Sequence, residues 1–115
     1  MTSSAPVTFV NDELFPTLVI GCPLPAVVVF EKSCWGTTHM MKPILEKVAS
    51  DYINKIQVFK YDLEKSSVIS ERYGIEDSIA ILVFNSGELV YRTGVISNTE
   101  LKKIINPFIN SPVNP

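Results

Sequence analysis

The sequence contains few residues that could carry metal or thiol chemistry: two cysteines, Cys22 and Cys34, and one histidine, His39, among 115 residues. The cysteines do not form a Cys-x-x-Cys pair, the spacing typical of dithiol centres and of zinc half-sites. Zinc sites in proteins take four ligands, which His39 and one neighbouring cysteine cannot supply. The sequence therefore predicts no metal site, and Cys22 is expected to be an inert, buried or half-buried thiol.

Long apolar runs and a strong charge of either sign are also missing. No run approaches the roughly 18–20 residues that span a bilayer, and the N-terminal residues MTSSAPVTFV do not resemble a secretory signal. A net charge of −2 gives no electrostatic reason to expect nucleic acid or an anionic membrane as a partner. These absences predict a cytoplasmic location, where thiols usually stay reduced.

Apolar residues are abundant enough for one core. Hydrophobic residues make up 46% of the chain and charged residues 19%, and 115 residues can bury a core without disulfides or metals. We expect a single domain over residues 1–115, with its ordered part at about 7–106. The proline- and asparagine-rich stretch 107–115 is predicted to be a flexible tail.

The stretch from Ala26 to Val48 organises the prediction. Its first five residues, Ala26 to Phe30, are apolar and predict a strand buried on both faces. A polar turn leads into a helix over about 37–52, which contains Pro43 and is capped by Thr37 or Thr38. The helix has an apolar stripe at 3.6-residue spacing, formed by Met40, Met41, Ile44, Leu45 and Val48. The strand-to-helix junction therefore lies where open α/β sheets bind ligands.

The remaining elements follow from alternation, turns and caps. Further strands are predicted at 6–10, 56–62, 79–84 and 88–93, the last two as an antiparallel hairpin. Short helices are expected after Asn11 or Asp12 and after Ser66 or Ser67. The last helix starts at the capping box 97–100 and is predicted to end at Pro107. This order predicts an α/β fold, β-α-β-α-β-α-β-β-α, with helices on both faces of a mixed sheet.

The junction resembles the active-site segment of the thioredoxin family, in which a strand ending in Phe leads to Trp-Cys-Gly-Pro-Cys and then to a helix carrying Pro-Ile-Leu. Aligned without a gap, the matching residues are Phe30, Gly36, Met40, Pro43, Ile44 and Leu45. Further matches include Tyr73-Gly74-Ile75, Phe84, Gly87-Glu88 and Gly94, so the resemblance covers about residues 7–106. It implies the thioredoxin fold and a link to cell redox homeostasis.

The sequence departs from the family at its reactive positions. Where the family has its nucleophilic cysteine, resolving cysteine, buried aspartate and cis-proline, this chain has Trp35, Thr38, Val29 and Ile79. Lys60 matches a family lysine, but the acidic neighbour of that lysine is replaced. The resemblance thus implies an atypical thioredoxin-like protein without dithiol-disulfide oxidoreductase activity. A cis bond before a non-proline residue costs about 3–4 kcal/mol, so we expect the Ser78–Ile79 bond to be trans.

Two functions follow from the resemblance. In thioredoxins the face around the cysteines docks extended protein segments, and the matching positions here are Trp35, Gly36, Ile79, Gly94 and Val95. A tryptophan beside aliphatic side chains is typical of an interface anchor. We therefore expect a redox-deficient adaptor that binds a protein partner and needs no cofactor. Two variants stay open: Trp35 folds back as core, or the apolar face joins two copies in a homodimer.

The alternative function depends on Cys34, which stands just before the predicted helix. Monothiol members of the thioredoxin superfamily exchange one cysteine with glutathione. Cys34 could therefore serve as a catalytic thiol in monothiol thiol-disulfide exchange, with glutathione as the co-substrate. The ungapped register puts Trp35 at the nucleophile's position, so a partly buried Cys34 would be only a space-filling residue.

Overall fold

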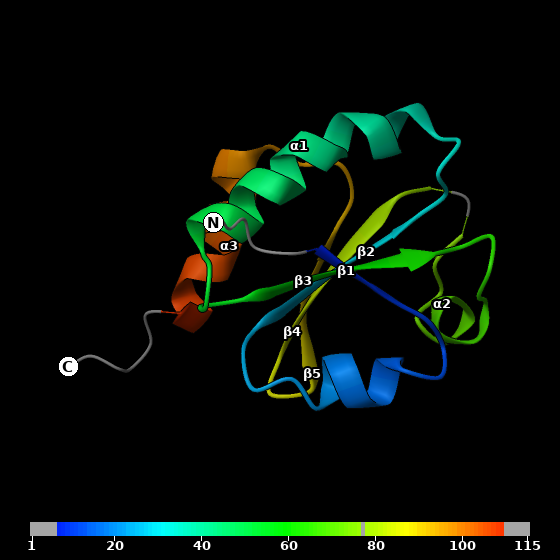
Figure 1. The fold of residues 1–115 in the computed structure, drawn as a ribbon, viewed down its shortest axis with the longest axis horizontal. Helices are drawn as coiled ribbons and strands as arrows, with labels where there is room; N and C mark the ends of the chain where they lie inside the picture. The colour runs from blue at the N-terminus through cyan, green and yellow to red at the C-terminus, as the bar shows by residue number, and fades with distance from the viewer. Residues whose placement is uncertain (1–6, 77, 110–115) are drawn as a thin grey trace.

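The central strand of the fold is the apolar run that follows Pro25. In the computed structural model, which describes residues 7–76 and 78–109, all six residues of this strand are buried. The elements in chain order are β1 (Val7–Val10), the short π-helix η1 (Pro16–Ile20), β2 (Ala26–Glu31), α1 (Gly36–Asp51), β3 (Gln57–Asp62), α2 (Val68–Arg72), β4 (Ala80–Asn85), β5 (Glu88–Thr93) and α3 (Asn98–Ile109) (Figure 1). This order agrees with the predicted one.

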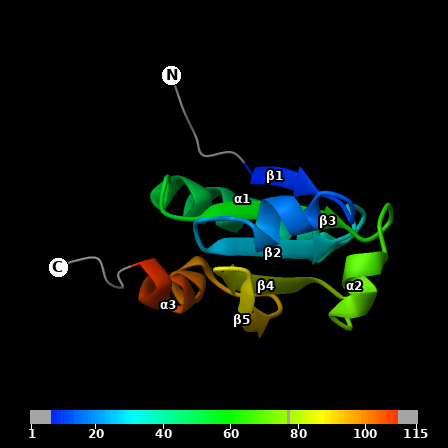
Figure 2. The ribbon, with the colours of Figure 1, turned by 90° about the horizontal axis from the view of Figure 1, so that it is seen from below.

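The sheet is mixed, as predicted. Its strand order is β1-β3-β2-β4-β5, and Figure 2 shows the strands in this order from top to bottom. β1 and β2 each run parallel to β3, their common neighbour. β4 lies between β2 and β5 and runs antiparallel to both. Because β2 lies at the centre and has neighbours on both sides, the turn that follows it starts from the best-supported strand of the sheet.

Helices cover both faces of the sheet, and each face has its own core. α1 and α3 lie on one face, and η1 and α2 lie on the other (Figure 1). Along β2, Val27 and Val29 pack toward α1 and α3, while Val28 and Phe30 pack into the opposite core. Period-two alternation inside a wholly apolar run thus supplies both cores, which explains why the run contains no polar residue before Glu31.

α1 begins one residue earlier than predicted, and its cap differs. Trp35 is the N-cap, and neither threonine caps the helix. The Thr38 hydroxyl instead donates to the carbonyl of Lys32 over 2.7 Å, because it lies inside the first turn and reaches back to the preceding loop. The predicted apolar stripe is also too wide. Met41 is fully buried, but Met40 is 51% exposed.

α3 packs beside α1 and continues past Pro107. The prediction that Pro107 ends this helix is wrong, because the helix runs to Ile109. A proline in a last turn removes one N–H donor but already has a helical φ. The predicted tail therefore starts inside a helix, and residues 110–115 lie outside the described residues. Ser97 Oγ accepts from the N–H of Glu100, which is one half of the predicted capping box.

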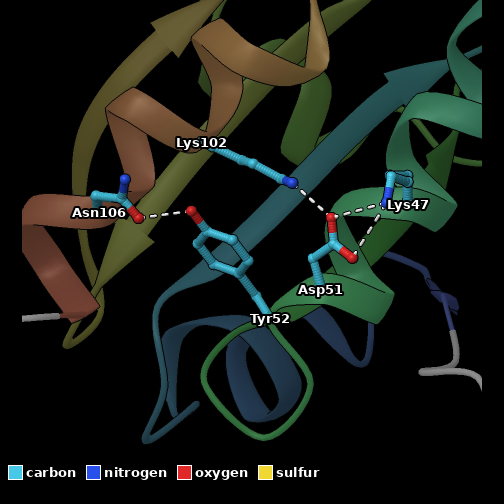
Figure 3. A network of polar contacts seen from close by, with 5 residues as sticks. All are labelled: Lys47, Asp51, Tyr52, Lys102 and Asn106. Atoms are coloured by element: carbon cyan, nitrogen blue, oxygen red, sulfur yellow. Dashed lines mark hydrogen bonds and ion pairs between the residues drawn. The ribbon is translucent and has the colours of Figure 1, made fainter.

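Polar side chains connect α1 to α3 across their exposed edge (Figure 3). Asp51 accepts from Lys47 on its own helix and from Lys102 on α3, and the Tyr52 hydroxyl donates to Asn106. Contacts of this kind orient two helices that the apolar core already holds together.

Asp12 caps a different helix from the predicted one. Its carboxylate accepts from the N–H groups of Ser67, Val68 and Ile69, at the start of α2, and from the Tyr61 hydroxyl. Asn11 instead closes the turn before η1, by accepting from the Leu14 N–H. A side chain after β1 therefore holds a helix more than fifty residues further along the chain.

Candidate functional site

The turn between β2 and α1 holds Trp35 at the tip of the helix. The Lys32 carbonyl accepts from the Trp35 N–H at 3.1 Å and from the Thr38 hydroxyl at 2.7 Å, so both bonds converge on one oxygen. The ammonium of Lys32 lies 5.6 Å from the centre of the indole ring, within range of a cation–π contact. This arrangement leaves the N-terminal end of α1 with an aromatic side chain rather than a thiol.

The structure brings all five predicted binding residues together. Trp35 and Gly36 at the start of α1, Ile79 before β4, and Gly94 and Val95 after β5 line one shallow hollow of about 640 Å³. Three segments that are distant in sequence thus meet at this point. The hollow is open to solvent and is not an enclosed cavity, which suits a docked chain better than an engulfed small molecule.

Trp35 is neither fully exposed nor fully buried. Part of it packs against the core under α1 and α3, and the rest lines the hollow. Ile79 is 6% exposed and supports the floor, whereas Val95 is 47% exposed at the rim. No cis peptide bond occurs among residues 7–76 and 78–109, so the Ser78–Ile79 bond is trans, as predicted.

The two cysteines have different surroundings. Cys22 is buried in the core under η1 and α2, in agreement with the prediction of a buried or half-buried thiol. Cys34 is an exposed free thiol and does not line the hollow around Trp35. The interpretation of Cys34 as a partly buried filler is therefore wrong, because the turn directs this residue to solvent. Trp35, one residue later, packs inward.

Sequence analysis missed a charged pair at the end of β2. Glu31 is 6% exposed, and its Oε2 lies 3.5 Å from Nζ of Lys60 on β3. Burial raises the pKa of Glu31, and the neighbouring Lys60 offsets only part of this rise. The available signal was the period-two spacing Val27, Val29, Glu31, which puts the carboxylate on the face toward α1. The family's buried acid corresponds to position 29, whereas this chain has its buried acid two residues later, on the same face of β2.

Two kinds of feature were not found among the residues that the structure describes: a cluster of metal-type ligands and a helix long and apolar enough to span a membrane. Among residues 7–76 and 78–109, no three His, Cys, Asp or Glu side chains converge as metal ligands would. Within the same ranges, every helix is too short or too polar to cross a bilayer.

Comparison with known proteins shows the family to which the chain belongs. The family model described as thioredoxin matches residues 6–107. The chain belongs to the thioredoxin family. It is 30% identical to a thioredoxin of Porphyra purpurea over 105 residues, which cover 90% of this chain and 98% of the relative. It is 33% identical to a thioredoxin-like protein of Synechocystis over 96 residues, covering 83% of this chain and 91% of the relative.

Plant relatives are longer. The thioredoxin M5 of Oryza sativa, named chloroplastic, is 27% identical over 106 residues, which cover 91% of this thioredoxin-family chain. The chain spans 62% of the length of that relative and 61% of a chloroplastic M-type thioredoxin of Triticum aestivum. The segment shared with these relatives thus coincides with the part of the chain that matches the thioredoxin family model.

Proposed function

We propose that this thioredoxin-family protein binds an extended protein segment through the hollow around Trp35, without a covalent step. One observation supports this above the others: Trp35 caps α1 and opens onto a hollow formed with the loops before β4 and after β5. The sequence has no Cys-x-x-Cys pair, and Cys22 is buried in the core on the other side of the sheet. A dithiol reaction at this face therefore has no second sulfur.

The shape and chemistry of the hollow suit a peptide. Trp35 offers a rigid apolar surface of the kind that dominates binding energy in protein interfaces, with Ile79 and Val95 beside it. Gly36 and Gly94 carry no side chains, which leaves room for a partner backbone to approach closely. The proposed partner is a protein segment with apolar side chains, rather than nucleic acid or a membrane, because the chain has a net charge of −2. We place this interaction in the cytoplasm.

Peptide selection tests the proposal. Linear peptides displayed on phage would be selected on the full chain, and the affinities of the winners measured by calorimetry. Trp35→Ala should weaken binding about tenfold or more, as expected for an aromatic anchor worth about 2 kcal/mol. Tyr91→Ala, which removes another partly exposed aromatic side chain from β5, is the matched control and should bind normally. Equal affinity in both variants would exclude Trp35 as the anchor.

A reductase assay tests the non-covalent part of the proposal. With dithiothreitol as electron donor, the protein should reduce insulin disulfides no faster than the background reaction. Turnover well above background that survives Trp35→Ala and disappears in Cys34→Ser would overturn this part and favour the alternative.

The alternative is monothiol exchange by Cys34 with glutathione, and the exposure of this thiol favours it. The Cys34 thiolate would attack the mixed disulfide of a glutathionylated client, bond to the glutathione sulfur and release the client thiol. A second glutathione thiolate would then attack the Cys34–glutathione bond, which yields oxidised glutathione and restores Cys34. Mass spectrometry of the protein after exposure to oxidised glutathione should then show one adduct, which Cys34→Ser abolishes.

A second copy of the chain is the remaining candidate occupant of the hollow, and its binding would form a homodimer. A second copy would bury Trp35 of both chains in a symmetric contact. Light scattering across a range of protein concentrations would detect such a dimer, and Trp35→Ala should dissociate it.

A further inference from the structure

A second cleft opens on the α1 face of the sheet, at the carboxyl ends of β1, β3 and β2. Its volume is about 640 Å³, within the range of about 300–1,000 Å³ that is typical of small-molecule sites. The carboxyl ends of parallel strands are where open α/β sheets usually bind ligands. This cleft shares no lining residue with the hollow around Trp35, so it is a separate site.

The floor of the cleft contains a buried carboxylate with an unused oxygen. The side chains of Glu31 and Lys60 both line the cleft and are only 8% and 13% exposed. Oε2 of Glu31 faces the ammonium of Lys60, but Oε1 is buried without a hydrogen-bond partner. A buried acceptor without a donor costs free energy. A ligand that supplies an N–H or O–H to Oε1 would recover this energy.

Lys60 provides the complementary group. An ammonium has three N–H donors, and its contact with Glu31 engages one side of it. The pair at the floor therefore contains an unused hydrogen-bond acceptor and a hydrogen-bond donor next to each other. Their counterpart in a ligand is an N–H adjacent to a C=O, which is the edge of an amide or a lactam.

The charges around the cleft favour a ligand that is neutral overall. Besides the floor pair, the fully charged lining residues are two acids and two bases: Asp62, Glu64, Lys42 and Lys65. The formal charges of the lining thus cancel when His39 is neutral. A charged ligand would lose its hydration on entering the cleft and would find no net opposite charge there. Its desolvation would therefore be costly.

Phe9 supplies an apolar wall. It lies directly beside Lys60 in the parallel pairing of β1 and β3, so both side chains project from the same face of the sheet. Phe9 is 66% exposed and lines the cleft. An exposed aromatic ring beside a polar floor offers a surface on which a flat ring can stack.

From this placement we infer that the cleft binds a small, neutral, planar molecule through an amide-type edge. The ligand N–H donates to Oε1 of Glu31, its carbonyl oxygen accepts from Lys60, and its ring lies against Phe9. The edge could belong to a primary carboxamide on a ring or to a lactam within a ring. Two probes separate these sources: nicotinamide for the carboxamide and uracil for the lactam.

Titration of the full ¹⁵N-labelled chain with each probe, followed by NMR, tests the inference. At least one probe should cause saturable shifts in amides that line this cleft and none around Trp35. N,N-Diethylnicotinamide is the matched control ligand, because it keeps the ring and the carbonyl but has no N–H; its binding should be much weaker. If neither probe causes saturable shifts, for example because a buried water satisfies Oε1, the inference is overturned. It is also overturned if the control ligand binds as tightly as the probes.

The variant Glu31→Gln tests the role of the carboxylate. The amide oxygen of glutamine would turn to Lys60, so its NH₂ would face the ligand N–H, and affinity should fall about tenfold or more. Glu88→Gln makes the same chemical change on β5, outside the cleft, and should bind as the natural protein does. Unchanged affinity in Glu31→Gln would overturn the inference.

A measurement on the unmodified chain covers the case in which Glu31→Gln does not fold. The carboxyl ¹³C signal of Glu31 would be followed against pH with and without the bound probe. A donor to Oε1 favours the ionised form, so saturating probe should lower the pKa of Glu31. A pKa that stays the same or rises while the probe is bound would show that Oε1 does not receive the N–H.

Discussion

Asp12 shows how much of this fold depends on a single side chain. Its carboxylate receives the N–H groups that start α2 and also the hydroxyl of Tyr61 on β3. Burial alone would raise the pKa of Asp12, but these hydrogen bonds together hold the pKa below its usual value. The residue therefore connects the loop after β1, the sheet and α2, and it does so best when ionised.

Replacing Asp12 by alanine should lower the free energy of unfolding by about 2 kcal/mol, because a lost helix cap costs about 0.5–2 kcal/mol and the Tyr61 hydroxyl also loses its acceptor. Urea denaturation followed by circular dichroism measures the change. Glu13→Ala, at the exposed neighbouring position, is the control and should change stability by less than about 0.5 kcal/mol. Equal losses in the two variants would contradict the capping role.

The pH dependence follows from the sign of the pKa shift. Because the pKa of Asp12 is lower in the folded state, its contribution is fully present above the pKa of the unfolded chain. That contribution disappears as pH falls through the folded pKa, so Asp12→Ala should flatten the acid side of the stability profile. The raised pKa of Glu31 acts in the opposite direction. The contribution of Asp12 is therefore obtained as the difference between the stability–pH profiles of the natural protein and of Asp12→Ala.

At the scale of the elements, α1 is a half-buried helix with a sharp boundary between its faces. Met41 has no exposed surface, and Met40, one residue earlier, is 51% exposed. A rotation of about 100° per residue is enough to turn a side chain from the core to the edge of the stripe. Pro43 also lies on the exposed side, so burial of its ring does not explain a proline inside this helix.

Alanine substitutions at Met40 and Met41 test where the boundary between the buried and exposed faces of α1 lies. Met41→Ala should destabilise the protein by about 2–5 kcal/mol, because it opens a cavity in the core under α1 and α3. Met40→Ala should change stability by no more than about 0.5 kcal/mol. Thermal unfolding of both variants gives the comparison. A large loss in Met40→Ala would mean that the helix is rotated relative to this structure.

The contact between α1 and α3 is electrostatic at its exposed edge (Figure 3). Hydrogen bonds from Lys102 and Lys47 hold the pKa of Asp51 below its usual value. Its stabilising effect is therefore present above the unfolded pKa and is lost as pH falls through the folded pKa. Since the group is exposed, salt should screen it.

Asp51→Asn should lower the melting temperature slightly at low salt and near-neutral pH, and the difference should vanish in high salt or at acidic pH. Glu46→Gln is a suitable control, because Glu46 is also an exposed acid on α1 and takes no part in the contacts of Asp51 with Lys47 and Lys102. A loss in Asp51→Asn that persists in high salt would indicate that packing, and not charge, is responsible.

At the scale of the whole molecule, the two thiols lie in different environments. Cys22 lies in the core under η1 and α2, and Cys34 lies outside both cores at the turn before α1. Each thiol therefore reports on a different event: Cys34 on the native surface and Cys22 on opening of the fold.

Labelling with a chromogenic disulfide reagent should show one fast thiol and one slow thiol under native conditions. The fast phase should disappear in Cys34→Ser, and the slow phase should speed up with denaturant, because Cys22 reacts only when the core opens. Two equally fast thiols in the native protein would contradict the burial of Cys22.

Much of the fold was predictable because its signals are local. The apolar run of β2, the hairpin of β4 and β5 and the apolar spacing of α1 each occupy one short segment, and together they predicted the order of the elements along the chain and a mixed sheet. Helix ends were predicted less well. Trp35 replaced the expected threonine cap, and Pro107 did not stop α3, because a helix end depends on what its neighbours in space supply.

The sequence by itself determined the elements, the family and the set of residues around Trp35, because runs, periods and aligned motifs can be seen along the chain. Only the tertiary structure decided which distant groups meet. It joined Asp12 to the start of α2, and it buried Glu31 beside Lys60 with one oxygen unpaired. Such contacts join residues on different strands and loops, and nothing in the local pattern of either partner specifies the other.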